Sequence, residues 1–139
     1  MHQPARRLSK LRESTIREMT RVAQQYGAIN LAQGFPDFPP PAEVLAAAHA
    51  AIDAGHNQYA ITWGVKPLRD ALTAKLRERY GLDFDPERHV AVTCGVTEAI
   101  GAALLAAVDP GGEVLILEPF HENYLPAATF AGADAVFHA

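Results

Sequence analysis

The sequence has little of what several classes of protein require. It contains a single cysteine, Cys94, so no disulfide can form within the chain, which favours a reducing compartment. No apolar run is long enough to span a bilayer, and no apolar stretch follows the basic N-terminus as it would in a secretory signal. We therefore expect a cytoplasmic protein with no membrane partner. We interpret the basic start as a solvated arm, with an organelle-targeting segment as the alternative.

The sequence also lacks a large excess of charge of one sign. Its 12 basic and 16 acidic side chains give a net charge of −4, which offers no reason to expect a nucleic-acid partner. Hydrophobic residues make up 49% and charged residues 20% of the 139 residues. This composition and length predict a globular chain with enough residues for one domain core.

Hydrophobic periodicity predicts an α/β fold. Helical spacing occurs over residues 14–25, 42–54, 67–80, 96–108 and 124–131. Short β-branched or apolar runs predict strands at 89–93, 114–117 and 135–137, and their alternation with helices predicts parallel strands. Helix 96–108 is apolar nearly all round, so we expect it to be buried. Because the last strand runs into Ala139 without a covering helix, we expect the chain to be a fragment.

A glycine turn between a predicted strand and a predicted helix is the first candidate site. Gly95 would allow close approach, and the backbone N–H groups of Val96 and Thr97, with the Thr97 hydroxyl, would face an anion over the helix start. Phosphate is the usual occupant of such a turn, although many similar turns bind nothing. We interpret Cys94, beside this turn, as a small buried residue rather than a nucleophile.

Two further loops carry aromatic or polar groups. The segment 118–124 follows the strand 114–117, so it lies at the same sheet edge as the glycine turn, where a flat ring could stack on a flat cofactor. The alternative is that Phe120 and Tyr124 are core residues and His121 lies on the surface. In the loop 57–59, Tyr59 either packs its ring or offers its hydroxyl to a phosphate. The other histidines lack metal-ligand spacing, so we predict no metal site.

Four blocks in this order resemble the kynurenine and methionine aminotransferase branch of the class I/II aminotransferases, which are fold-type I enzymes that use pyridoxal 5'-phosphate (PLP). The blocks are INLAQGFPDF at 29–38, NQY at 57–59 followed by Gly64, Pro67, Leu68 and Arg69, VTCGVTEA at 92–99, and EPFHENY at 118–124. The resemblance covers nearly the whole chain from about Ser14. Four blocks in register are more specific than any one of them.

The resemblance implies an α/β architecture in which an N-terminal arm and helices lead into the first part of a mostly parallel sheet of the large domain. Residues 1–40 would form the arm, helix and substrate loop, and residues 41–139 the truncated start of the PLP-binding domain. Gly95, Val96 and Thr97 would hold the cofactor phosphate. Tyr59 would reach the phosphate of the neighbouring subunit in a homodimer, and Gly34 would lie near the substrate carboxylate.

His121 departs from the family pattern, since Phe, Tyr or Trp is more usual at the position that stacks on the cofactor ring. Histidine can stack, but it also titrates near neutral pH. We therefore expect weaker or more pH-sensitive cofactor binding than a Phe would give.

The resemblance also implies that the catalytic groups lie elsewhere. In this family the Schiff-base lysine, the carboxylate for the pyridinium nitrogen and the arginine for the substrate carboxylate lie C-terminal to the region seen here. The lysines present are Lys10, Lys66 and Lys75, and none is placed to be the Schiff-base lysine. We expect no catalytic residue in this chain and no transamination by the chain alone.

The predicted function is transfer of an amino group between an amino acid and a 2-oxo acid, by the complete enzyme. Kynurenine, methionine, glutamine and a diaminopimelate precursor all stay open as donors. A PLP-dependent carbon–sulfur β-lyase is one alternative, because related folds host both chemistries. A truncated, non-catalytic module that dimerises or binds phosphate is another.

Overall fold

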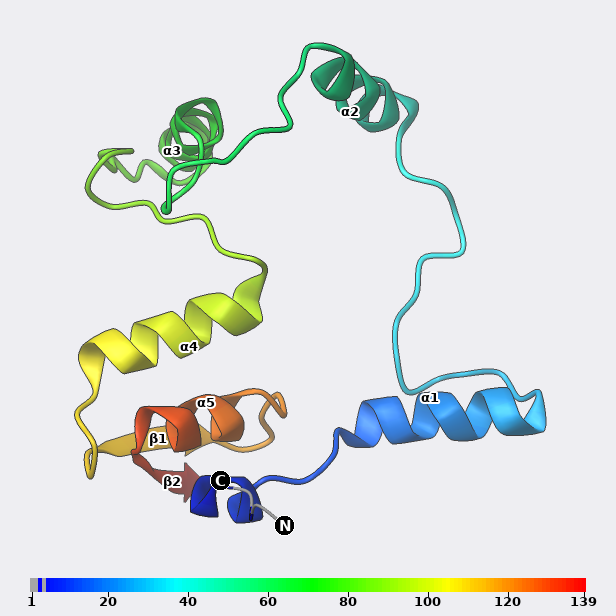
Figure 1. Ribbon diagram of the computed structural model, residues 1–139, viewed down its shortest axis with the longest axis vertical. Helices are drawn as coiled ribbons and strands as arrows, with labels where there is room; N and C mark the ends of the chain where they lie inside the picture. Colours follow the sequence, from blue (N-terminus) through cyan, green and yellow to red (C-terminus); the bar gives the residue numbers. More distant parts are fainter. Residues whose placement is uncertain (1–2, 4) are drawn as a thin grey trace. The chain divides into compact units, whose positions relative to one another are not determined.

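Figure 1 shows the computed structural model of the chain, which describes residue 3 and residues 5–139. His2, for which a structural or exposed role is expected, lies outside the described residues. The chain divides into two compact units, one formed by Met1–Gly34 with Cys94–Ala139 and the other by Phe35–Thr93.

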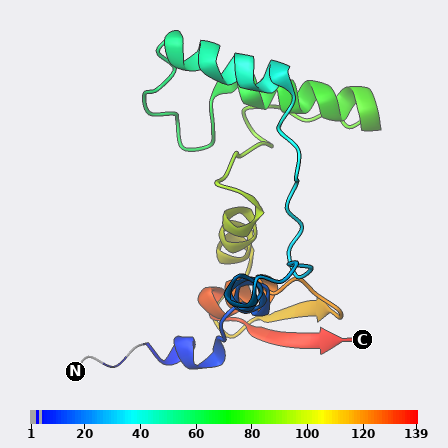
Figure 2. The same ribbon diagram turned by 90° about the vertical axis from the view of Figure 1, so that its right-hand side faces the viewer.

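The first unit contains a two-stranded parallel sheet. Strand β1, Glu113–Leu117, pairs with β2, Asp134–His138, in a register that sets Glu113 opposite Asp134 and Leu117 opposite His138. The connecting helix α5, Tyr124–Ala131, lies against both strands and against helix α4, Val96–Ala107 (Figures 1 and 2). This is the α/β arrangement with parallel strands that the apolar runs predict.

Small apolar residues form the core of this unit. The buried apolar side chains are one strand residue and four alanines on or just after α5: Ile116, Ala127, Ala128, Ala131 and Ala133. Alanines on the inner face of α5 leave room for its backbone to approach the sheet, and the branched Ile116 side chain fills space beneath it. The carboxyl end of β1 is thereby held close to the start of α5.

The N-terminal part of the same unit consists of a 3-10 helix, Arg6–Lys10, and helix α1, Thr15–Tyr26. The side chain of Ser14 caps α1 by accepting a hydrogen bond from the Arg17 N–H at 3.2 Å. No residue of α1 is buried, so this cap and surface contacts hold the helix.

The second unit contains helices α2, Ala42–Asp53, and α3, Lys66–Tyr80. Its most buried side chain is that of Arg69, which is 1% exposed. The Arg69 Nε donates to the Gly64 carbonyl at 2.9 Å, and Nη1 donates to the Pro86 carbonyl and pairs with Glu87 at 3.1 Å. Arg69 therefore ties the start of α3 to the segment that follows it.

Two expectations about these elements are wrong. Residues 89–93 do not form a strand, because the strands in the described part of the chain are β1 and β2 and the Val92 N–H donates instead to the Trp63 carbonyl at 3.0 Å. Helix α4 has no buried residue, and Leu105 is 65% exposed. Its contact in this unit is with α5, so an apolar surface all round is not enough to bury it within this chain.

No helix among the described residues has both the length and the apolar character needed to cross a membrane.

Candidate functional site

The turn that opens α4 has the geometry of an anion site. Gly95 is the N-cap residue, with φ +82°, and apart from its chain neighbours no atom lies within 4 Å of the position where a Cβ would sit. The side chains of Val96 and Thr97 are exposed beside it. The N–H groups of the first helical turn have no intrahelical acceptor, and the helix dipole adds partial positive charge there. The three residues predicted to hold a phosphate therefore lie together at an open helix start.

A carboxylate also lies at this helix start. Glu98 is in the first turn of α4, and its Oε2 accepts a hydrogen bond from the Cys94 N–H. An acidic residue three positions after the N-cap is a common way to satisfy a donor just before a helix. Cys94 itself is exposed, so the expectation that it is a buried residue is wrong.

The loop after β1 presents His121 to solvent. The imidazole Nδ1 accepts a hydrogen bond from the Asn123 N–H at 3.3 Å, and its ring lies 6.1 Å from that of Tyr124 with a tilt of 55°. This contact holds the imidazole ring next to the start of α5. Phe120 packs within the unit, because its ring stacks on that of Phe137 of β2 with the two ring centroids 5.3 Å apart. Of the two rings, His121 is therefore the one available to a ligand.

Asn123 joins this loop to the glycine turn. Its side-chain Nδ2 donates to the Thr97 Oγ1 at 2.7 Å, across 26 positions of sequence. The loop that carries His121 and the turn that carries Thr97 are thus brought together by this hydrogen bond, although residues 89–93 before the turn form no strand of the sheet. Sequence reasoning missed Asn123, because an asparagine directly before a helix is the pattern of an N-cap.

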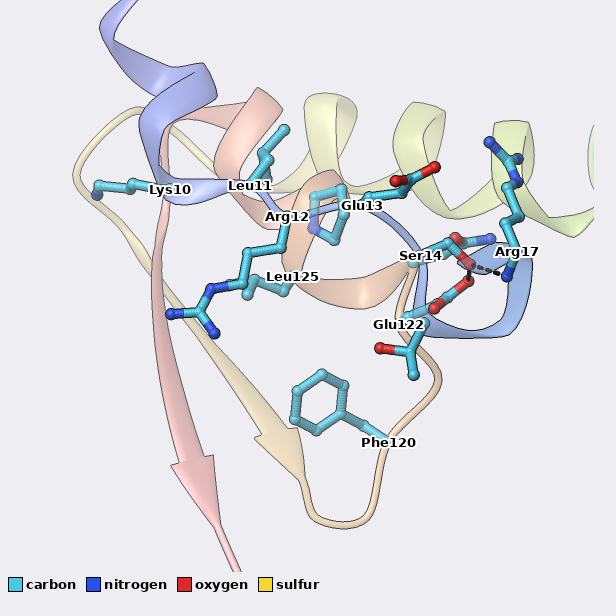
Figure 3. A pocket seen from close by; sticks show the side chains of 12 residues that line it. Lys10, Leu11, Arg12, Glu13, Ser14, Arg17, Phe120, Glu122 and Leu125 are labelled. Carbon is cyan, nitrogen blue, oxygen red and sulfur yellow. Dashed lines mark hydrogen bonds between the residues drawn. The ribbon is translucent and has the colours of Figure 1, made fainter. Parts of the chain in front are cut away.

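The neighbouring residue, Glu122, joins the loop to α1. The Ser14 hydroxyl donates to the Glu122 Oε1 while it accepts from the Arg17 N–H, as the dashed lines in Figure 3 show. A cavity of about 470 Å³ lies beside this contact, lined in part by Arg12, Phe120 and Glu122. Two consecutive side chains therefore bond to the starts of two helices. Glu122 bonds to the start of α1, and Asn123 bonds to the start of α4.

The other two predicted site residues are Gly34 and Tyr59, and they belong to different units. Gly34 lies after α1 in the first unit, with no atom within 4 Å of the position of a Cβ. Tyr59 belongs to the second unit, and its side chain is fully exposed there. Their roles stay predictions.

Shifted pKa values occur away from the turn. A hydrogen bond from Arg21, and then its charge, lower the pKa of Glu13, and the same contact raises the pKa of Arg21. Both groups lie on or just before α1. Among the described residues no three His, Cys, Asp or Glu side chains form a group that could hold a metal ion.

The three lysines are all on the surface. Lys66 Nζ lies 2.8 and 2.7 Å from the two carboxylate oxygens of Asp70, and Lys10 Nζ lies 3.8 Å from Asp134. Lys75 is exposed on α3. Lys66 and Lys10 are thus each held beside a surface carboxylate.

The amino-acid sequence of the chain is similar to those of known aminotransferases. Residues 26–139 match the family model of aminotransferase class I and II. The chain is 48% identical over 130 residues to the probable N-succinyldiaminopimelate aminotransferase DapC of Mycobacterium tuberculosis, covering 94% of this chain and 33% of that protein. It is 40% identical over 135 residues to human kynurenine–oxoglutarate transaminase 1, covering 96% of this chain and 32% of that protein.

Solved structures agree with the sequence relatives. The structure of N-succinyldiaminopimelate aminotransferase from M. tuberculosis superposes with a TM-score of 0.91 at 46% identity, over 97% of this chain and 35% of that one. The chain thus spans about a third of the length of the curated relatives it matches. Because the family model covers most of the chain, from the end of α1 to Ala139, the chain belongs to the class I and II aminotransferases.

Proposed function

We propose that the complete protein carrying this chain is a PLP-dependent aminotransferase that moves an amino group between an amino acid and a 2-oxo acid. The observation that carries the proposal is the open turn Gly95–Thr97 joined through Asn123 to the loop of His121, in a chain of the aminotransferase family. Members of this family use PLP.

The residues present fit this cofactor. A phosphate needs several N–H or O–H donors at an open position, and the first turn of α4 provides backbone N–H groups and a hydroxyl beside a glycine with no atom within 4 Å of its Cβ position. A pyridine ring needs a flat partner, and the exposed imidazole of His121 lies on the loop tied to that turn. The Glu98 carboxylate faces the Cys94 N–H, so the donors for the phosphate are those of Val96 and Thr97.

The roles of the individual residues follow from their chemistry. Val96 and Thr97 bind the phosphate through backbone N–H groups, and Gly95 lets it approach. His121 stacks on the ring and Gly34 lies near the substrate carboxylate. Tyr59 donates its hydroxyl to the phosphate of the other subunit of a homodimer.

The chemistry of the reaction requires groups beyond this chain. PLP supplies an electron sink, and the protein supplies the lysine that bonds to it and moves protons at the substrate carbon. Because Lys10 and Lys66 pair with carboxylates and Lys75 lies on an exposed helix surface, we assign that lysine to another part of the complete protein. We also propose that the complete protein is cytoplasmic. We further propose that residues 1–40 form the arm, helix and substrate loop and that residues 41–139 begin the PLP-binding domain.

Transfer of a labelled amino group tests this proposal. The complete protein, loaded with PLP, is mixed with pairs of a ¹⁵N-labelled amino acid and a 2-oxo acid, chosen from N-succinyldiaminopimelate, kynurenine, methionine and glutamine as donors. We expect ¹⁵N in the amino acid formed from the 2-oxo acid, measured by mass spectrometry. Release of pyruvate and a thiol from an S-substituted cysteine, without ¹⁵N transfer from any donor, would instead assign a β-lyase and contradict the proposal.

A further inference from the structure

The side chain of Asn123 is used in an unusual way. Asn123 is the N-cap residue of α5, a position where asparagine normally accepts a hydrogen bond from the first turn of its own helix. Here its side chain makes no cap hydrogen bond, and Nδ2 donates to the Thr97 Oγ1 at 2.7 Å. The start of α5 therefore loses a stabilising contact, and the start of α4 gains one.

This bond determines what the Thr97 hydroxyl can do. A hydroxyl has one proton to donate and lone pairs that accept. Because Asn123 donates to the oxygen, the Thr97 hydroxyl is held as an acceptor on that side, and its own proton points to another partner. Among the side-chain hydrogen bonds of the described residues, the one that involves the Thr97 hydroxyl is this bond from Asn123, so the hydroxyl proton can serve a ligand at the helix start.

A second Asn–Thr pair in the same unit shows the contrast. Asn30 Nδ2 donates to the Thr20 Oγ1 at 3.0 Å, and the Thr20 hydroxyl donates in turn to the Ile16 carbonyl at 2.9 Å. There the hydroxyl proton is used within α1. At Thr97, next to the Gly95–Val96 turn, the described residues show no corresponding bond from the hydroxyl to a helix carbonyl.

Asn123 also contacts the other predicted cofactor residue in this unit. Its backbone N–H donates to the Nδ1 of His121 at 3.3 Å. Asn123 thus orients the Thr97 hydroxyl, on the phosphate side, through its side chain. It orients the His121 imidazole, on the ring side, through its backbone. A substitution that removes only the side chain affects the first contact and leaves the backbone donor in place.

We propose that Asn123 is a positioning residue that fixes the Thr97 hydroxyl as a donor to the cofactor phosphate. The inference rests on the proposed function, because it needs PLP at this turn. It predicts that the Asn123 side chain contributes to binding of the phosphate and contributes nothing to binding of the pyridine ring.

The test compares two ligands that differ only in the phosphate. Dissociation constants of PLP and of pyridoxal are measured by fluorescence for the complete protein and for its Asn123→Ala, Asn123→Asp, Thr97→Val and Asn123→Ala/Thr97→Val variants. Asn30→Ala, which removes the other Asn–Thr bond, is the matched control. The ³¹P chemical shift of bound PLP provides a second readout that a loss of stability alone does not change.

The expected result is selective for the phosphate. Asn123→Ala weakens PLP binding roughly fivefold, as the loss of one oriented hydrogen bond does, and changes the ³¹P shift, while pyridoxal binding is unchanged. Asn123→Asp weakens PLP binding at least as much, because its carboxylate accepts the Thr97 proton and repels the phosphate. Asn123→Ala adds nothing in the Thr97→Val background, and Asn30→Ala binds both ligands as the parent protein does.

Other results separate the two proposals. If the parent protein binds PLP but Asn123→Ala binds it equally well, or loses PLP and pyridoxal affinity to the same extent, the role of Asn123 is wrong and the proposed function stands. Additive losses in the double variant also overturn the role, because Asn123 would then act without Thr97. If the parent protein binds neither ligand, both proposals fail.

Discussion

The two units bury different kinds of side chain. In the described part of the first unit the buried residues are Ile116, four alanines and Thr129, whereas in the second unit they are Arg69 and Thr73. Both units expose large apolar side chains, with Leu31 91% exposed in the first and Phe35 72% exposed in the second. Apolar packing therefore holds the β1–α5–β2 region, while a hydrogen-bonded arginine organises α3 and the segment after it.

The difference bears on how each unit tolerates change. An apolar core loses stability in proportion to the volume removed, because the cavity only partly collapses. A buried arginine acts through a few directed bonds, so its loss leaves its hydrogen-bond acceptors without their donor. Stability measurements on the complete protein distinguish these two modes.

The largest effect is expected in the apolar core. Replacing Ile116, which is 3% exposed, by alanine removes buried methyl and methylene groups beneath α5 and is expected to cost about 3 kcal/mol of unfolding free energy. Leu115→Ala, on the other face of the same strand where the side chain is 63% exposed, is the control and is expected to cost well under about 1 kcal/mol. If urea denaturation gives the same loss of unfolding free energy for both variants, β1 is not packed as described.

The next effect concerns Arg69. Arg69→Ala leaves the carbonyls of Gly64 and Pro86 without this donor and Glu87 without its partner, for an expected loss of about 2 kcal/mol. Arg77→Ala on the same helix breaks only an exposed pair with Asp83 and is expected to cost at most about 1 kcal/mol. If both variants unfold at the same urea concentration, the second unit does not depend on its buried arginine.

A smaller effect separates α1 from the core within the first unit. Because α1 buries no residue, Ser14→Ala, which removes the cap and the bond to Glu122, is expected to cost about 1 kcal/mol and to increase hydrogen exchange in α1. Ser9→Ala removes an exposed hydroxyl bond to the Arg6 carbonyl and serves as the control. Unchanged exchange rates in α1 after Ser14→Ala would show that the cap does not hold it.

The smallest effect is a pH dependence. The Arg21 hydrogen bond and charge lower the pKa of Glu13 below its ordinary value of 4.5, so this contact stabilises the folded state above that pH and is lost as the pH falls through the lowered pKa. Both side chains are exposed, so we expect a slight effect that salt weakens. Thermal melts of the parent protein and of Glu13→Gln between pH 3 and 7, roughly the range in which a carboxylate titrates, should converge at the acid end. A difference in melting temperature that stays constant over this pH range would contradict the assignment of the effect to the Glu13–Arg21 contact.

Most elements could be predicted from the sequence because their signals are local. Ser14 begins α1, the apolar run at 114–117 forms β1, and α5 covers the predicted residues 124–131. Residues 89–93 have the composition of a strand, yet a strand forms only where another strand offers its backbone, and here Val92 bonds to Trp63.

The site could be predicted only in part, for the same reason. The turn Gly95–Thr97 and the loop of His121 are continuous in sequence, so pattern and family resemblance find them. Asn123 and Glu122 act on Thr97 and Ser14, which lie 26 and 108 positions away. Such side-chain contacts leave no periodic signal, so they appear only once the fold brings the segments together.

The most direct test of the account is to locate the lysine that bonds to the cofactor. The complete protein is loaded with PLP, reduced with borohydride, digested and analysed by mass spectrometry. We predict a phosphopyridoxyl group on one lysine outside residues 1–139. Modification of Lys10, Lys66 or Lys75 as the single site, or no modification at all, would contradict the account.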